Sequence, residues 1–183
     1  MKKRIKKGQV ITLMVTVTMM LMTANMFAQG KTSFAGSWAI NAEKSNSGQA
    51  AGQGQAQGQN PGQRAGGFGG DFIAKQDGNL LTVERTRTNR DGVANTTVTK
   101  YTLDGKESIN STARGDSKSV ATWSPDGKVL TIKTSRTMDM NGESRTMTST
   151  EVWKLTDATT LTIETTMGTP NGERKVTAVY NKK

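Results

Sequence analysis

Two long stretches of alternating apolar and polar residues meet at Asn141-Gly142. Asn-Gly between alternating segments is the strongest short-range signal for a β-hairpin with a two-residue turn, because both turn residues adopt positive φ. Such a turn pairs residues that are equidistant from it, which places Leu130 opposite Trp153. A shift of one residue would turn both side chains outward, so the pattern itself predicts the register.

The same pairing predicts a partly polar inner face. It places Arg136 beside Met147 and Glu151 beside Ile132, on the side that Leu130 and Trp153 share. Ionised groups are rarely buried without a partner. Arg136 and Glu151 lie four residues apart along the strand pair, about 13 Å at strand rise, which is too far for a direct ion pair.

Turn signals recur along the rest of the chain at short, regular spacing, with no helical pattern between them. They are Asp77-Gly78, Asp91-Gly92, Asp104-Gly105, Arg114-Gly115-Asp116, Asp126-Gly127, Thr156-Asp157 and Asn171-Gly172. Such spacing is typical of hairpins in sequence, and a sheet of about ten strands favours closure over two open edges. The predicted fold is an all-β, antiparallel up-and-down β-barrel of eight to ten strands.

Two turns also predict the loop length and the register of the strands that they join. Asn89-Arg90-Asp91-Gly92 suits a three-residue hairpin loop, which pairs Leu81 with Tyr101 and Arg85 with Thr97. The same loop at residues 124–127 would place Trp123 outward beside Val129, whereas a four-residue loop would bring Trp123 inward beside Leu130. Both alternatives stay open from the sequence.

The chain begins with features of a signal peptide over residues 1–28. A basic start precedes an apolar run from about Val10 to Met22, and Ala24-Asn25-Met26-Phe27-Ala28 leads to a predicted cleavage site after Ala28, with Met26 larger than the small residue usual at that position. The run is short for a membrane span. We therefore expect an exported protein, periplasmic or extracellular, with no membrane span after cleavage; an uncleaved N-terminal anchor is the alternative.

Residues 29–183 are predicted to form one domain that carries an insert. Residues 33–41 alternate in the manner of a first strand, with Trp38 inward. The stretch from Asn46 to Gly70 then holds nine Gly and six Gln in 25 residues. Such a composition cannot bury enough apolar surface to offset its ordering entropy, so residues 46–70 are predicted to be a disordered loop.

Charge and composition exclude several functions. Five of the 25 basic residues precede the apolar run, and the remaining 20 against 15 acidic residues leave a charge of +5. These residues are scattered, without the basic and aromatic clusters that bind nucleic acid, so no nucleic-acid partner is expected. The outward positions include Glu84, Lys133 and Lys154, which do not suit a lipid-facing band.

The chain has no cysteine and no histidine. Their absence excludes Cys-His and Ser-His catalytic pairs and the common zinc sites. Glu151 has no second acid or base predicted within reach, because Glu84 falls on the outer face and the Asp residues lie in turns. We therefore expect no enzyme activity, no catalytic residues, no metal and no cofactor.

Gly36-Ser37-Trp38 and the stretches 101–108 and 169–173 resemble motifs of a group of uncharacterised secreted bacterial lipocalin-like proteins. Gly36-Ser37-Trp38 is the Gly-x-Trp element at the start of the lipocalin barrel, where Gly36 and Trp38 have structural roles, and further matches occur at 101–108 and 169–173. The resemblance implies a lipocalin-like or calycin-like barrel with a small-molecule pocket. It also implies an arginine packed across Trp38, for which Arg174 is the candidate.

These observations give a binding hypothesis. An interior arginine without a partner favours an anionic head group, since the guanidinium fork suits a carboxylate or phosphate. The predicted ligand is a small anionic or amphipathic molecule inside the barrel. The candidate site residues are Arg85, Arg136, Glu151, Trp153, Met147, Leu130 and Tyr101. Arg85 is also the candidate to meet Glu151 across the barrel.

The alternative is a structural or envelope-associated module without a small-molecule ligand. It would use its Thr-rich outer face and its Gly/Gln insert to contact other macromolecules. A barrel filled by its own side chains would favour this alternative, and an accessible interior would favour the binding hypothesis.

Overall fold

The computed structural model describes residues 30–46, 70–88, 92–112, 115–140, 143–169 and 172–183. Residues 31–183 form one compact unit. Ten strands lie in it, all antiparallel to their neighbours: β1 Gly36–Asn46, β2 Phe72–Asp77, β3 Leu80–Thr88, β4 Ala94–Thr102, β5 Glu107–Thr112, β6 Gly115–Trp123, β7 Val129–Met140, β8 Glu143–Leu155, β9 Thr160–Thr169 and β10 Gly172–Lys182. The predicted signal peptide and residues 47–69 of the predicted insert lie outside the described residues.

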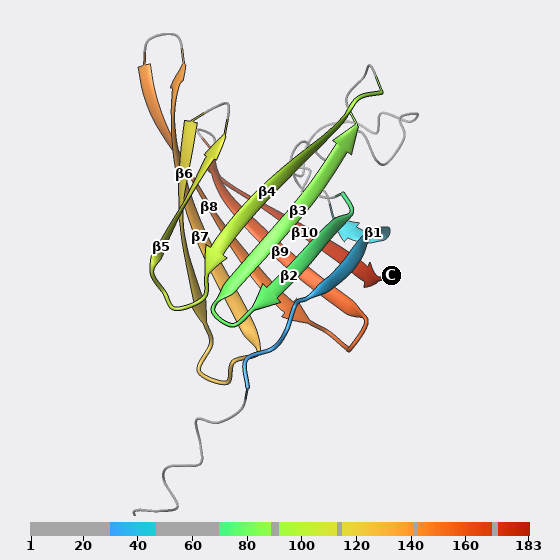
Figure 1. Cartoon of the computed structure of the whole chain (residues 1–183). Helices are drawn as coiled ribbons and strands as arrows, with labels where there is room; N and C mark the ends of the chain where they lie inside the picture. The colour runs from blue at the N-terminus through green and yellow to red at the C-terminus, as the bar shows by residue number, and fades with distance from the viewer. Residues whose placement is uncertain (1–29, 47–69, 89–91, 113–114, 141–142, 170–171) are drawn as a thin grey trace, which may run out of the picture. The chain divides into compact units, whose positions relative to one another are not determined.

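The strands follow one another around the sheet as an up-and-down meander. Their order is β4-β3-β2-β1-β10-β9-β8-β7-β6-β5, so the first and last strands pair and the chain closes into a nearly complete barrel (Figure 1). The fold is therefore the predicted antiparallel β-barrel, with ten strands. The part of the chain that the structure describes contains no helix long and apolar enough to cross a membrane.

The hairpin of β7 and β8 has the register predicted from its alternation. Leu130 pairs with Trp153, Ile132 with Glu151, and Arg136 with Met147. The β3–β4 hairpin likewise pairs Leu81 with Tyr101 and Arg85 with Thr97, as predicted. Both registers are confirmed because in each hairpin only one register turns the apolar side chains inward.

The first strand differs from its prediction at both ends. It begins at Gly36 and continues to Asn46, with a register shift against β10 between Asn41 and Asn46. Ser45 stabilises this irregular part, since its hydroxyl accepts a hydrogen bond from the Val179 amide at 2.9 Å. The sequence 41–45 had no alternating pattern, and its strand conformation depends on this contact with β10.

Trp123 faces inward, which decides between the two loop alternatives. It pairs with Leu130, and the turn is closed by the Ser124 amide donating to the Val129 carbonyl at 2.8 Å. The Trp123 ring stacks on Phe34, with centroids 5.7 Å apart and planes within 8°. The shorter loop, with Trp123 outward, is thus wrong.

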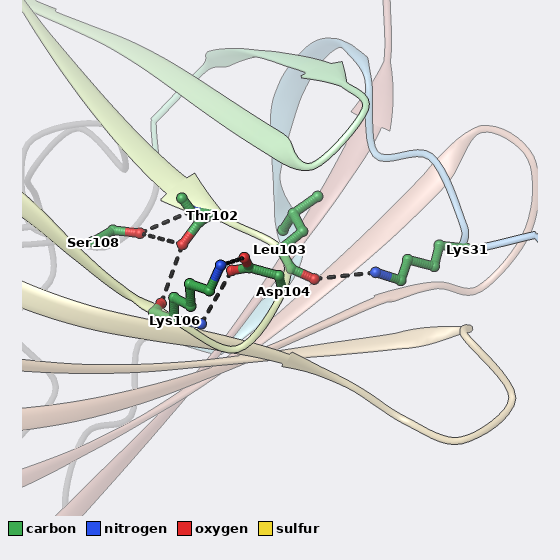
Figure 2. Close-up of polar contacts among 6 residues, drawn as sticks. All are labelled: Lys31, Thr102, Leu103, Asp104, Lys106 and Ser108. Carbon is green, nitrogen blue, oxygen red and sulfur yellow. Dashed lines mark hydrogen bonds and ion pairs between the residues drawn. The ribbon is translucent and has the colours of Figure 1, made fainter.

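Side chains close the seam between β4 and β5, the two outer strands in the sheet order. The Asn110 amide group donates to the Lys100 carbonyl at 2.9 Å and accepts from the Lys100 amide at 2.8 Å. Near the turn that joins the strands, the Ser108 hydroxyl accepts from the Thr102 amide at 2.8 Å (Figure 2). Asn110 thus occupies the hydrogen-bonding positions that a backbone partner would fill.

One end of the barrel is packed with aromatic and aliphatic side chains. This closed end carries the turns at residues 78–79, 103–106, 124–128 and 156–159 and the segment that precedes β1. Phe34 lies among Trp123, Trp153 and the Trp38 indole, which donates to the Phe34 carbonyl at 2.9 Å. Trp38 and Trp153 are almost completely buried.

The segment before β1 is held in place by contacts with three turns or strands. The Lys31 ammonium donates to the Leu103 carbonyl at 3.1 Å (Figure 2) and lies 5.8 Å from the Trp123 ring centroid. The Thr32 amide donates to the Gly127 carbonyl, and Gln76 accepts from the Phe34 amide at 3.0 Å. These bonds hold the segment so that the Phe34 side chain is buried at the closed end.

Candidate functional site

Along β8 and β10 the inward-facing side chains change from buried to exposed. On β8 the inward side chains run from buried Trp153 through half-buried Glu151 to exposed Met147, which is 47% accessible. On β10 they run from buried Tyr180 to exposed Arg174. Met147 and Arg174 lie toward the end of the barrel at which β3, β5, β7 and β9 finish. We call it the open end, because its inward-facing side chains are accessible to solvent.

A layer of small hydroxyl groups separates the apolar core from the open end. Its buried polar residues are Ser117 and Ser119 on β6 and Thr165 on β9. The Ser119 and Thr134 hydroxyls lie 2.9 Å apart, and the Ser117 hydroxyl donates to the Asn110 carbonyl at 3.2 Å. Because these groups are hydrogen-bonded, the layer is a stable boundary between the two halves.

Arg136 lies at the level of Ser117, with which it pairs on one side, and it pairs with Met147 on the other. Its Nε atom is buried and has no hydrogen-bond partner among the described residues. A buried donor without a partner costs about 1–3 kcal/mol, more when the group is charged. The arrangement is therefore stabilised when an acceptor, such as the oxygen of an anion, is supplied.

Glu151 was expected to meet Arg85, but it forms no ion pair with an arginine among the described residues. One carboxylate oxygen accepts a hydrogen bond from the Trp153 indole at 2.9 Å. Within the described ranges, no ion pair within 4.0 Å joins Glu151 to Arg85 or any other base. The predicted meeting of Arg85 and Glu151 is thus not observed, and Glu151 instead orients the indole of its neighbour along β8.

Arg85 is held on an aromatic face. Its guanidinium carbon lies 5.1 Å from the Phe72 ring centroid, a cation–π arrangement with the residue it pairs with across the strands. Sequence reasoning could not find this contact, because it depends on β2 lying beside β3 with this register. The stacking fixes the charge on the inner face between the aromatic core and the open end.

Burial and the charged groups of this region shift the pKa values of two tyrosines, Tyr101 and Tyr180. Burial raises the pKa of Tyr101 well above its ordinary value of 10.0; Glu151 raises it further, and Arg85 and Arg136 lower it. Burial likewise raises the pKa of Tyr180 to about 12, with the charge of Arg85 opposing the shift. Arg85, Arg136 and Glu151, predicted to form one site with Tyr101, are therefore close enough to Tyr101 for their charges to affect its pKa.

The apolar residues predicted to line the site divide into two groups. Leu130 and Trp153 are completely buried against protein side chains, and Tyr101 is nearly so. Met147 is accessible at the open end. Of these residues only Met147 is exposed enough for contact without disturbing the core. Trp153 donates a hydrogen bond to the half-buried Glu151 and so fixes that carboxylate.

Three inward-facing arginines at the open end were missed by sequence reasoning. Arg87 pairs with Asn95, Arg145 with Met138, and Arg174 with Met167. The signal was present for Arg87 and Arg145, since each shares the strand parity of residues already placed inward. Basic residues near turns usually lie on the solvated surface, so their location beside turns gave no reason to assign these arginines to the inner face.

Arg174 does not pack across Trp38, so the role implied by the lipocalin resemblance is wrong for it. Trp38 pairs with Lys182, whose ammonium lies 5.7 Å from the indole ring centroid. Arg174 lies eight residues earlier on β10, about 27 Å away at strand rise. The cation at Trp38 is thus supplied by a lysine at the end of the last strand.

Carboxylates do not gather into a metal site in the part of the chain that the structure describes. No group of three or more Asp or Glu residues lies close enough there to hold an ion. The site is instead a set of guanidinium groups with one carboxylate, which suits an anion rather than a cation.

Comparisons with known proteins agree with the architecture. No family model matches the chain, and no curated protein matches it significantly. Among solved structures, the chain is similar to the zebrafish ileal bile acid-binding protein complexed with cholic acid, at 15% identity and a TM-score of 0.50. The match covers 83% of this chain and all of that protein. At this identity the likeness concerns the fold alone, an antiparallel β-barrel that is lipocalin-like or calycin-like in architecture.

Proposed function

We propose that the protein is an exported, non-enzymatic barrel that holds a small anionic or amphipathic molecule at its open end. The observation that carries this proposal is the buried Nε of Arg136, which has no hydrogen-bond partner among the described residues. A carboxylate or another oxyanion would supply the missing acceptor. Met147, paired with Arg136 and accessible, would contact the apolar part of the ligand.

The fold supports the proposal at the level of architecture. Barrels of this type enclose one ligand when their interior is not filled by side chains. Here the cluster of buried hydrophobic side chains lies in the closed half, and inward-facing residues of the other half, such as Met147, are accessible. The zebrafish protein with a similar barrel is a bile acid-binding protein, and a bile acid such as cholic acid is itself an amphipathic carboxylate.

The test is Arg136→Met, measured with decanoate by isothermal titration calorimetry and by chemical denaturation. We expect decanoate binding to be lost while the free energy of unfolding stays equal or rises, because no buried partner is left unpaired. Lys133→Met is the matched control: it removes a cation three residues away on the same strand, on the outer face. Its binding should remain.

Two outcomes would contradict the proposal. Arg136→Met could lower the free energy of unfolding by roughly 3–5 kcal/mol, which is the effect of breaking a buried charge network. Alternatively, wild-type protein purified from its source could carry no ligand in native mass spectrometry and bind no amphipathic acid. Either result would favour a structural or envelope-associated module, the reading that the filled closed half of the barrel supports.

A further inference from the structure

The side-chain bridges across the seam between β4 and β5 lie toward the closed end. The Lys100 amide and carbonyl bond to the Asn110 side chain at 2.8 and 2.9 Å, and the Thr102 amide donates to the Ser108 hydroxyl at 2.8 Å. Toward the open end β4 runs away from β5 and β6 (Figure 1). Its residues before Lys100 pair with β3 on one side, and within the described part of the chain no strand lies on the other.

Three backbone positions on this free side of β4 lack a strand partner. The amide and carbonyl of one strand residue point to the same side, and the side alternates from residue to residue. Because those of Lys100 point toward β5, those of Val98, Thr96 and Ala94 point the same way. They bond to no other strand or turn among the described residues, and all three residues are exposed. We call residues 94–98 the β4 edge.

The β4 edge lacks the features that usually keep the edges of two sheets apart. Natural edge strands carry lysine or proline, contain a bulge, or are covered. The sequence from Ala94 to Val98 is Ala-Asn-Thr-Thr-Val, without charge or proline, and its pairing with β3 is continuous. Val98 faces outward and is 48% accessible. Such an edge is suited to accept another extended strand through main-chain hydrogen bonds.

We infer that the β4 edges of two copies of this chain pair antiparallel and join the two barrels into a dimer. A two-fold axis at Thr96 sets each Thr96 opposite the other and places Ala94 opposite the partner's Val98, so that all three free positions find a partner. A second copy fits because the edge is uncharged, which sets no like charges opposite each other. The small Ala94 also gives the exposed valine an apolar neighbour. The dimer does not depend on the ligand proposed above, since its contacts lie at the seam.

The chain has no cysteine, so one introduced cysteine can report the register of the dimer. Thr96 and Thr86 are a matched pair, because they pair with each other on β4 and β3 and both are exposed. In the dimer the two copies of residue 96 have Cα atoms about 5.5 Å apart, within disulfide range. The two copies of residue 86 lie three strand spacings apart, about 14 Å, which is too far.

We therefore expect Thr96→Cys to form a disulfide-linked dimer under mild oxidation, and Thr86→Cys to form at least about tenfold less in the same time. Electrophoresis without reductant measures both. Equal amounts of linked dimer from the two variants would overturn the inferred pairing, because random collision of exposed thiols gives that result.

A second pair of variants tests the association itself, measured for the full chain by sedimentation equilibrium. Over about 5 to 500 μM, a range suited to small transient interfaces, the mean mass of the wild type should rise from one chain toward two. Val98→Lys adds a charge to the edge and should weaken association by about tenfold or more. Ile73→Lys is the control, with an effect below about twofold. Ile73 and Val98 flank Glu84 in one outward row and both are exposed, but β2 has a strand on each side.

Three results would overturn the inference. The first is a wild-type chain that stays monomeric over the whole range. The second is equal weakening by Val98→Lys and Ile73→Lys, which would place the contact on the outer face of the sheet and not on the edge. The third is a monomer whose β4 edge instead binds an uncharged extended peptide, in a manner that Val98→Lys abolishes, since the partner would then be a foreign strand.

Discussion

The closed and open halves of the barrel are built from the same strands but differ in the side chains that face inward. In the closed half, Phe34, Phe72 and Trp153 pack edge to face at centroid distances near 5.6 Å and exclude water. In the open half, the same strands carry arginine and methionine side chains that solvent contacts. The stability of the molecule therefore resides in one half and its candidate chemistry in the other, because a group packed well enough to hold the fold cannot also contact a ligand.

The largest effect should come from emptying the closed half. Trp153→Ala removes a completely buried side chain that contacts Phe34 and Phe72. We expect the free energy of unfolding to fall by about 3–5 kcal/mol, measured by chemical denaturation. A loss below about 1 kcal/mol would mean that the core does not depend on the aromatic cluster and that the two halves differ less than described.

High pH should lower the free energy of unfolding through Tyr180. Burial raises its pKa to about 12 in the folded protein, against an unfolded value near 10. The folded state therefore holds the proton more tightly, so this contribution is complete below pH 10 and is lost as the pH rises from 10 to 12. It amounts to at most about 3 kcal/mol.

Tyr180→Phe isolates this contribution. Its free energy of unfolding should fall less steeply between pH 10 and 12 than that of the wild type, because phenylalanine has no proton to lose. Identical slopes for the two proteins would show that Tyr180 ionises as readily in the folded chain as in the unfolded one.

A smaller effect is expected at the seam, which both halves share. Asn110→Ala leaves the Lys100 amide and carbonyl without their side-chain partner, at a cost of about 1–2 kcal/mol. Ser111→Ala, the next residue along β5 and exposed, is the control and should cost under about 0.5 kcal/mol. If both variants unfold at the same denaturant concentration, the side-chain bridge contributes nothing to closure.

The smallest effect belongs to the outer face. Thr148 is exposed and pairs with Ser135 on the side of the sheet opposite Trp153. Thr148→Ala should change the free energy of unfolding by less than about 1 kcal/mol. A cost equal to that of Trp153→Ala would contradict the assignment of the two faces.

The sequence predicted the faces of the hairpins but not what each face touches. Alternation with a two-residue period places Arg136 and Glu151 inward whatever the rest of the barrel does. It does not say that Glu151 bonds to Trp153, or that Arg85 lies over Phe72. These contacts join residues on the same face or on neighbouring strands, and their geometry depends on twist and register across the whole sheet.

What the sequence determined by itself is the strand pattern, the turns and the inward direction of the polar residues, because each depends on neighbours within one hairpin. The tertiary structure alone decided that β1 continues to Asn46, that Asn110 closes the seam, and that Lys182 rather than Arg174 lies over Trp38. It also decided that five arginines from four strands share one end. Those outcomes depend on closure, which brings together residues whose separation along the chain carries no periodic signal.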